Sequence, residues 1–336
     1  MPPRLREHPD DLAALIGAAA DGLALDQEYV EKDFWACEVL RACAMPTEVT
    51  GPGGSTGKLR VIFKGGTSLS RVFGLIERFS EDIDLLVQFP DVGAGAGTKD
   101  AVFKRVIATA ATHLGLPEDK VVAAGSTKGV KRNARFHYPT RRPASVTAAI
   151  SSGVLLEMGT RGGVFPTQVH EIRALIGDFA IREFGDSPDT WAEFMPFAVE
   201  VLAPERTLIE KLSALHSGAA RAPAEDALAT LQRNARHLYD IHCLLSDPSI
   251  VDALERLGPA GVAQLCADVD EHSAAAGFSF TPRPPGGFGA SPLLAGDNPG
   301  ADALRIGYRS AMSLVYGTQP TMEQCLDSIR ARADLL

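Results

Sequence analysis

Apolar residues along the chain follow two repeats, one typical of helices and one typical of strands. Spacings of three and four residues predict helices; Asp26 is placed to cap one of them and Gly115 to end another. The expected helices are 10–20, 26–42, 67–75, 101–114, 205–216, 231–245 and 301–316. Short runs rich in β-branched residues predict strands. The expected strands are 59–64, 82–89, 145–150, 154–158 and 197–202.

The pattern changes near Pro204, and this change divides the chain. Strands and helices mix up to residue 203, whereas helical periodicity dominates afterwards. We therefore expect an α+β fold, with a mixed sheet and N-terminal helices in a domain over 1–203 and a helical domain over 204–336. Surface loops are expected at 47–57 and at 281–300, where glycine and proline are concentrated.

Composition narrows the class of protein. The chain has 336 residues, 45% of them apolar, and a net charge of −9, which argues against a surface that is basic throughout. The five cysteines are scattered without a CxxC pair, which indicates free thiols rather than disulfides or a zinc site. Asp10, Asp11 and Asp21 interrupt the region where a signal peptide would be uncharged, and no long apolar run occurs. We expect a cytoplasmic protein without membrane contact.

Two aspartates stand at the start of an apolar strand. Side chains alternate along a strand, so Asp82 and Asp84 point to one face while Ile83 and Leu85 point to the other. Paired carboxylates repel each other, and a divalent cation such as Mg²⁺ between them removes that cost. The plainer interpretation is a solvated strand edge.

A glycine turn precedes this strand. Gly65 and Gly66 allow close approach of a ligand, and Thr67 and Ser68 add hydroxyl donors at the start of a helix. An ordinary turn would also use two glycines. Next to a metal-binding aspartate pair, however, the arrangement predicts a site for a nucleoside triphosphate (NTP) with Mg²⁺.

Glu157 places a third carboxylate in the apolar run "VLLEMG". A third acid beside two others completes the metal site of many phosphoryl and nucleotidyl transfer enzymes. We expect Glu157 to be either a further metal ligand or the general base, and its alternative is a charge at a strand edge.

These residues lead to a known family. "GGTSL…RFSEDIDL", preceded by "EKDFW" at 31–35, resembles the AbiEii/MenT nucleotidyltransferase-like toxins of the polymerase-β-type nucleotidyltransferase superfamily. "APERTLIEKLSALH" is similar to the third family motif, whose lysine is Lys211 here, and "RHLYDIHCLL" to the fourth, whose aspartate is Asp240. The similarity runs from about residue 26 to residue 245, and it implies a nucleotidyltransferase fold.

The resemblance assigns roles in the helical half. Lys211 lies beside the apolar stripe of Leu208, Leu212 and Leu215, and the family implies that its ammonium binds the triphosphate. A lysine there could instead be structural. Asp240 is implied to belong to the active site, where orienting Lys211 or Arg236 is expected rather than metal binding.

A basic segment at 128–142 could bind RNA. It contains no acid, and Phe136, His137 and Tyr138 lie among its cations, so the phosphate backbone could follow the charges while bases stack on the rings. The expected RNA-binding residues are Lys128, Lys131, Arg132 and Arg135, with Arg141 and Arg142 beyond them. A solvated basic loop or a contact with an acidic partner would fit equally well.

The resemblance implies a toxin that transfers a nucleotide from an NTP to an RNA 3′ end, with the tRNA acceptor stem as the family's target. It also implies a separately encoded antitoxin as partner and Mg²⁺ as cofactor. Two alternatives remain: a nucleotidyltransferase that modifies a small molecule, and a nucleotide-binding interaction module without activity.

Overall fold

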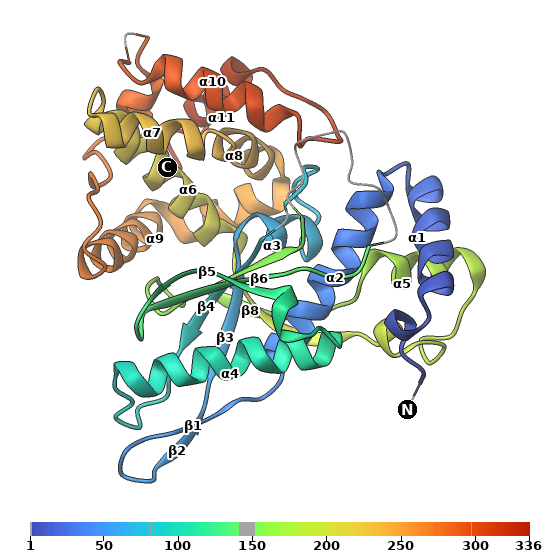
Figure 1. Cartoon of the computed structure of the whole chain (residues 1–336). Helices are drawn as coiled ribbons and strands as arrows, with labels where there is room; N and C mark the ends of the chain where they lie inside the picture. Colours follow the sequence, from blue (N-terminus) through green and yellow to red (C-terminus); the bar gives the residue numbers. More distant parts are fainter. Residues whose placement is uncertain (1, 81, 141–151, 297) are drawn as a thin grey trace. The chain divides into compact units, whose positions relative to one another are not determined.

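The structure is a computed structural model that describes residues 2–80, 82–140, 152–296 and 298–336. The chain forms two compact units (Figure 1). The first, the sheet unit, comprises Met1–Thr67, Ser80–Thr160 and Gln168–Val201. The second, the helical unit, comprises Ser68–Phe79, Arg161–Thr167 and Leu202–Leu336. The last division lies close to the expected boundary at 203/204, but no sequence signal assigned the two short segments to the helical unit.

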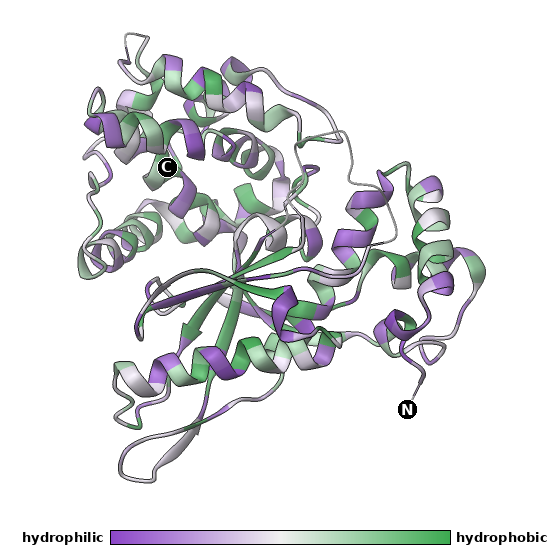
Figure 2. Ribbon diagram, viewed as in Figure 1, coloured by the Kyte–Doolittle hydropathy of each residue, from purple (hydrophilic) through white to green (hydrophobic). Residues whose placement is uncertain are grey.

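The sheet unit is built around a mixed sheet of seven strands in the order β5-β6-β7-β4-β3-β9-β8. The strands are β3 (Arg60–Lys64), β4 (Asp82–Gln88), β5 (Val121–Thr127), β6 (Lys131–Phe136), β7 (Val154–Gly159), β8 (Thr167–Ile172) and β9 (Phe197–Leu202). β4 is antiparallel to β3 and parallel to β7, and β3 is parallel to β9. Figure 2 shows hydrophobic residues along the middle strands, where Phe63, Ile83 and Leu156 are buried.

Two helices of the sheet unit, α2 (Gln27–Ala44) and α4 (Ala96–Leu114), pack on the sheet and on each other. Helices α1 (Pro9–Leu23) and α5 (Leu175–Phe179) pack on α2, and β1 (Glu48–Thr50) pairs with β2 (Thr56–Lys58) in a small hairpin. The expected caps are confirmed: Asp26 accepts the main-chain N–H of Glu28, and Gly115 ends α4 with a φ of 68°. Arg132 of β6 forms an ion pair with Asp100 of α4, so α4 lies on the face of the sheet to which the Arg132 side chain points.

The helical unit packs around one apolar core. Its helices are α6 (Pro204–Arg221), α7 (Glu225–Asn234), α8 (His237–Ser246), α9 (Pro248–Ala275), α10 (Ala301–Met312) and α11 (Met322–Ala331). The short helix α3 (Gly65–Arg71) starts in the sheet unit and ends in this one. The predicted apolar stripe on α6 is confirmed, because Leu208, Leu212 and Leu215 are buried in the core.

The structure corrects several expectations. The predicted helix 231–245 is two helices, α7 and α8, the helix expected over 301–316 ends at residue 312, and α11 was not expected. The segment 281–300 is not a plain surface loop, since Phe288 and Leu293 are buried and Ser291 hydrogen-bonds His216. Strands β5, β6 and β8 were not expected, and the strand expected at 145–150 lies outside the described residues. Within the described residues, no helix has the length and apolar character needed to span a membrane.

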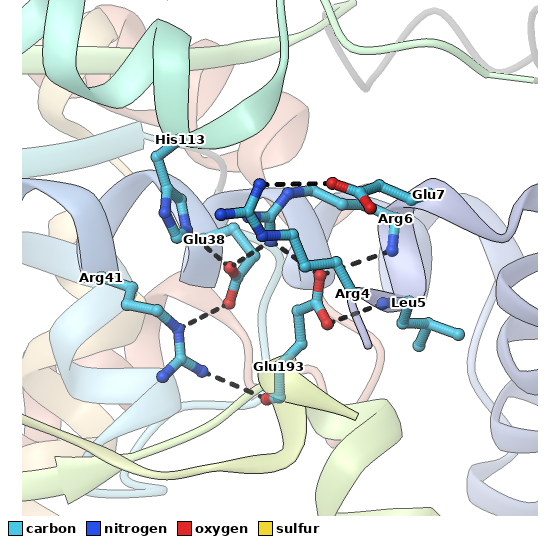
Figure 3. Close-up of polar contacts among 8 residues, drawn as sticks. All are labelled: Arg4, Leu5, Arg6, Glu7, Glu38, Arg41, His113 and Glu193. Carbon is cyan, nitrogen blue, oxygen red and sulfur yellow. Dashed lines mark hydrogen bonds and ion pairs between the residues drawn. The ribbon is translucent and has the colours of Figure 1, made fainter. Parts of the chain in front are cut away.

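Within the sheet unit, two buried glutamates, Glu38 and Glu193, bind residues near the N-terminus (Figure 3). The carboxylate of Glu193 accepts the main-chain N–H of Leu5 at 2.8 Å and binds Nη1 of Arg6 at 2.7 Å. The same Nη1 donates to Glu38 at 3.1 Å, and Arg41 donates to the main-chain oxygen of Glu193 at 3.1 Å. These charge-assisted bonds satisfy groups that would be costly to bury alone.

Glu38 has more basic partners than Glu193 in this cluster. Nε of Arg41 and Nε2 of His113 each lie 2.8 Å from its carboxylate. Burial raises the pKa of Glu38, but the hydrogen bond with His113 and the charge of Arg41 outweigh it and hold the pKa below its ordinary value. A lowered pKa in the folded state means that Glu38 stabilises the fold above the ordinary glutamate range and loses that contribution as the pH falls.

Glu38→Gln is expected to lower the free energy of unfolding of the sheet unit by about 2 kcal/mol at pH 7, because it removes charged hydrogen bonds. It should also flatten the fall in stability between about pH 5 and pH 3. Urea unfolding followed by tryptophan fluorescence measures this, since both tryptophans, Trp35 and Trp191, belong to the sheet unit. The exposed Glu48→Gln is the control, and equal acid slopes in wild type and Glu38→Gln would contradict the prediction.

Candidate active site

The glycine turn and the aspartate strand lie against each other in the sheet unit. Lys64 at the end of β3 pairs in register with Asp84 of β4, and Gly65 follows with a φ of +85°. A Cβ on residue 65 would overlap Oδ2 of Asp84. Thr67 Oγ1 donates to the main-chain oxygen of Asp82 at 2.6 Å. Two features therefore require glycine at position 65: the positive φ, and the Asp84 carboxylate that occupies the space of a side chain.

The carboxylates of interest share one face of the sheet. Asp82 and Asp84 are half-buried and alternate with the buried Ile83 and Leu85, as predicted. Asp84 pairs in register with Glu157 of β7, which places Glu157 on the same face. The next residues along these strands, Arg132 and Met158, pair in register and point to the other face, where Arg132 binds Asp100 of α4. The acids therefore lie on the face opposite α4. β4 and β7 thus bring together two acids that are far apart in the sequence.

Glu157 has protein partners. Nδ2 of Asn133, its register partner on β6, donates to the carboxylate, and Nζ of Lys131 lies 3.5 Å away. Oδ1 of Asn133 is buried without a hydrogen-bond partner among the described residues. Among the described residues, no group of three or more His, Cys, Asp or Glu side chains could hold a metal ion. The role of Glu157 as a third metal ligand therefore stays a prediction.

Asp82 and Asp84 alone fit Mg²⁺ well in chemical terms. This ion keeps several waters and binds one or two carboxylates together with substrate phosphates, rather than a closed protein cage. The Asp84 carboxylate lies close to Gly65, which itself carries no side chain to occupy the space of an ion or a phosphate.

The two hydroxyl residues of the turn lie inside the protein. Thr67 and Ser68 are buried, and the Thr67 hydroxyl binds the main chain of Asp82. Their contact with phosphate stays a prediction. Thr67 fixes the turn to the strand that carries the aspartates, and Gly66 beside it is also buried.

Gly65→Ala is expected to lower catalysis about a hundredfold, because displacement of a reacting group by about 1 Å has an effect of that size. Gly54→Ala is a matched control: Gly54 also has a positive φ, of +78°, but nothing lies within 4 Å of its absent Cβ. Both variants introduce backbone strain, and only the first displaces Asp84. Similar activities of the two variants would show that strain, not the carboxylate, is responsible.

Lys211 and Asp240 meet in the helical unit. Nζ of Lys211 lies 2.8 Å from Oδ2 of Asp240, so the expected orienting contact is present. The second partner of Asp240 is Arg78, not Arg236: Nε donates to Oδ1 at 2.6 Å and Nη2 to Oδ2 at 2.8 Å. Arg78 also donates to the main-chain oxygen of Phe79 at 3.1 Å. Three elements distant in the sequence are therefore joined by one buried carboxylate.

Arg78, Lys211 and Asp240 form an ion triad, and their charges shift one another's pKa values. Burial raises the pKa of Asp240, but the charges of Arg78 and Lys211 outweigh it and hold the pKa well below its ordinary value. Burial lowers the pKa of Lys211, Asp240 opposes this effect, and Arg78 adds to it. Burial and the charge of Lys211 lower the pKa of His237, so this imidazole is neutral at pH 7.

Residues 131–136 of the predicted RNA-binding segment form strand β6. Arg132 pairs with Asp100, Lys131 with Glu157, and Arg135 donates to the main-chain oxygen of Ser152. Lys128 is exposed in the turn before the strand, and Arg141 and Arg142 lie outside the described residues.

One of the aromatic rings in this segment is not available to bases, because Phe136 is buried in the core. Tyr138 stacks on Trp35 with ring centroids 5.3 Å apart and an angle of 11° between the planes. The expected stacking of bases on Phe136 is therefore wrong, whereas the predictions for Tyr138 and for the cations stay open.

Comparison with known proteins agrees with this arrangement. No curated protein matches the chain. The family model described as "Nucleotidyl transferase AbiEii toxin, Type IV TA system" matches residues 54–328, which include the glycine turn, β4, β7, α6 and α8. The match covers most of the chain and both units. The chain therefore belongs to the AbiEii family of nucleotidyl transferase toxins of type IV toxin–antitoxin systems.

Proposed function

We propose that this toxin transfers a nucleoside monophosphate from an NTP to the 3′ end of an RNA, with the acceptor stem of tRNA as its target, and so blocks translation. The observation that carries the proposal is the Asp84 carboxylate packed on the Gly65 turn, on the same sheet face as Glu157. A carboxylate beside a glycine turn is an arrangement that can hold a metal-bound triphosphate.

Each acidic or basic residue has a chemical task in this proposal. Asp82 and Asp84 would hold Mg²⁺, which when bound offsets negative charge on the triphosphate and on the departing pyrophosphate. Lys211 would bind a phosphate oxygen as a point charge while Asp240 holds its ammonium in place. Glu157 would accept the proton of the attacking 3′-hydroxyl or complete the metal site.

The reaction is a displacement at the α-phosphorus. The 3′-oxygen of the acceptor forms a bond to this phosphorus, the bond to the bridging oxygen breaks, and pyrophosphate leaves. Lys128, Lys131 and Arg135 would guide the RNA backbone, and Arg132 less so, because Asp100 already offsets its charge. A small-molecule acceptor is the second candidate, since the burial of Phe136 removes one expected base contact.

Purified protein incubated with Mg²⁺, each α-labelled NTP in turn, and either tRNA, other cellular RNA or a panel of aminoglycosides tests the proposal. We expect label in tRNA with one preferred NTP, and none when the tRNA 3′ end has been oxidised by periodate. Label only in a small molecule would favour the second candidate. Nucleotide binding without transfer to any acceptor would indicate an interaction module.

As members of type IV toxin–antitoxin systems, proteins of this family have an antitoxin partner. We propose that the partner of this chain is encoded separately, and that the toxin acts in the cytoplasm, where NTPs and tRNA are present.

A further inference from the structure

The ion triad of the helical unit contains more positive than negative charge. Arg78 and Lys211 are cations, Asp240 is their shared carboxylate, and the three residues are 1%, 6% and 0% exposed. No other carboxylate among the described residues lies within ion-pair distance of Arg78 or Lys211. Burial of an uncompensated charge is costly, so this arrangement favours an anion as an additional partner.

The hydrogen bonds show which cation is available to that anion. Arg78 uses Nε and Nη2 on the two oxygens of Asp240 and Nη1 on the Phe79 main chain, so each of its nitrogens has a partner. Among the described residues, the ammonium of Lys211 has one partner, Oδ2 of Asp240, and an ammonium has three donors. Lys211 is also the most exposed member of the triad.

We propose that Arg78 is a positioning residue that keeps Lys211 available to an anion. By binding both oxygens of Asp240, Arg78 offsets the carboxylate charge, so Asp240 holds Lys211 in place without neutralising it. Without Arg78, Asp240 and Lys211 would form a closed neutral pair. The proposal rests on the proposed function in one respect only: it identifies the anion as the triphosphate of an NTP.

The surroundings of Lys211 support this inference. His237 lies three residues before Asp240 on α8, and its buried Nδ1 has no hydrogen-bond partner among the described residues. Its neutral imidazole could donate a second hydrogen bond to an anion. The charged or titratable groups that act on Lys211 and His237 are Asp240, Arg78 and Arg236, of which only Asp240 is acidic.

Arg78→Met and Arg78→Lys test the proposal with inorganic tripolyphosphate as the probe. Calorimetric titration of the full chain is expected to give about tenfold weaker binding for Arg78→Met, because a buried charge is lost, and a smaller loss for Arg78→Lys. Arg206→Met is the matched control, since Arg206 is also a buried arginine of this unit with its own partner, Asp268, and should bind tripolyphosphate as wild type does.

The pKa of Lys211 is the readout that a merely structural role would not move. Measured by NMR of labelled lysine side chains, with Lys211→Met to assign the signal, it should rise in Arg78→Met because a neighbouring positive charge is removed. Should Arg78→Met fail to fold, Arg78→Lys decides: a folded Arg78→Lys with unchanged affinity and unchanged Lys211 pKa would overturn the proposal. So would wild-type affinity in folded Arg78→Met.

These results are separable from the proposed function. Wild-type protein that binds tripolyphosphate as described but transfers no nucleotide would refute the enzymatic proposal and leave the role of Arg78 intact. Lys211→Met that binds tripolyphosphate as tightly as wild type would refute the role of Arg78, whatever the transfer assay shows.

Discussion

Asp84→Asn is expected to lower nucleotidyl transfer roughly a thousandfold or more, which is the size of effect seen when a group of the reacting centre is removed. Asparagine has nearly the same shape as aspartate, so it still fits the space above Gly65, but it lacks the negative charge that a divalent cation requires. The rate of incorporation of a labelled NTP measures the effect. Asp82→Asn, on the same face of β4, should behave in the same way.

The control must separate the loss of this charge from a general change of the surface. Asp91→Asn removes one negative charge from an exposed position of the sheet unit and should retain wild-type transfer. Thermal unfolding of Asp84→Asn should match wild type, because the side chain is half-buried and changes little in size. Transfer by folded Asp84→Asn within tenfold of wild type would exclude Asp84 as a metal ligand.

Short-range sequence patterns predict the parts of this site that are built within a few residues. The alternation of Asp82 and Asp84 with Ile83 and Leu85 follows from the geometry of any strand, and the structure confirms it. The position of the glycine turn next to β4 could also be inferred, because strands 59–64 and 82–89 are consecutive along the chain and consecutive strands often pair. Neither inference needs knowledge of the rest of the fold.

Long-range contacts could not be predicted in this way. Nothing in the sequence around Arg78 indicates its partner, Asp240, which is 162 residues away. Asn133 beside Glu157 was missed because β6 is rich in charges, which favour an exposed loop in a sequence analysis. Both side chains make their contacts only because strands and helices distant in the sequence pack together. The spacing of residues along the chain does not predict such contacts.

The buried hydroxyl of Thr67 illustrates the same limit. Sequence analysis assigned it to phosphate because it follows two glycines, whereas the structure gives it a main-chain partner in β4. In the proposed function such a hydroxyl would contribute indirectly, by holding Asp82 and the turn in one fixed arrangement. Rigid support of this sort determines how precisely a reacting group is placed.

Asp240→Asn is expected to lower the free energy of unfolding of the helical unit by about 3–5 kcal/mol, because it leaves two buried cations without a counter-charge. The asparagine oxygen could still accept a hydrogen bond, but its amide group would face a cation. Addition of Arg78→Met to Asp240→Asn should recover part of the loss, since only Lys211 would then be uncompensated. A simple loss of packing would instead make the double variant less stable than either single variant.

Circular dichroism at the helical wavelength during urea unfolding measures this change, while tryptophan fluorescence reports on the sheet unit, which contains Trp35 and Trp191. Asp302→Asn is the control: its ion pair with Arg305 is exposed, and its loss should change stability by less than about 0.5 kcal/mol. A change of under about 1 kcal/mol for Asp240→Asn would contradict the prediction. It would mean that water or a relaxed side chain already compensates the two cations, which would also weaken the case that Lys211 needs an anion.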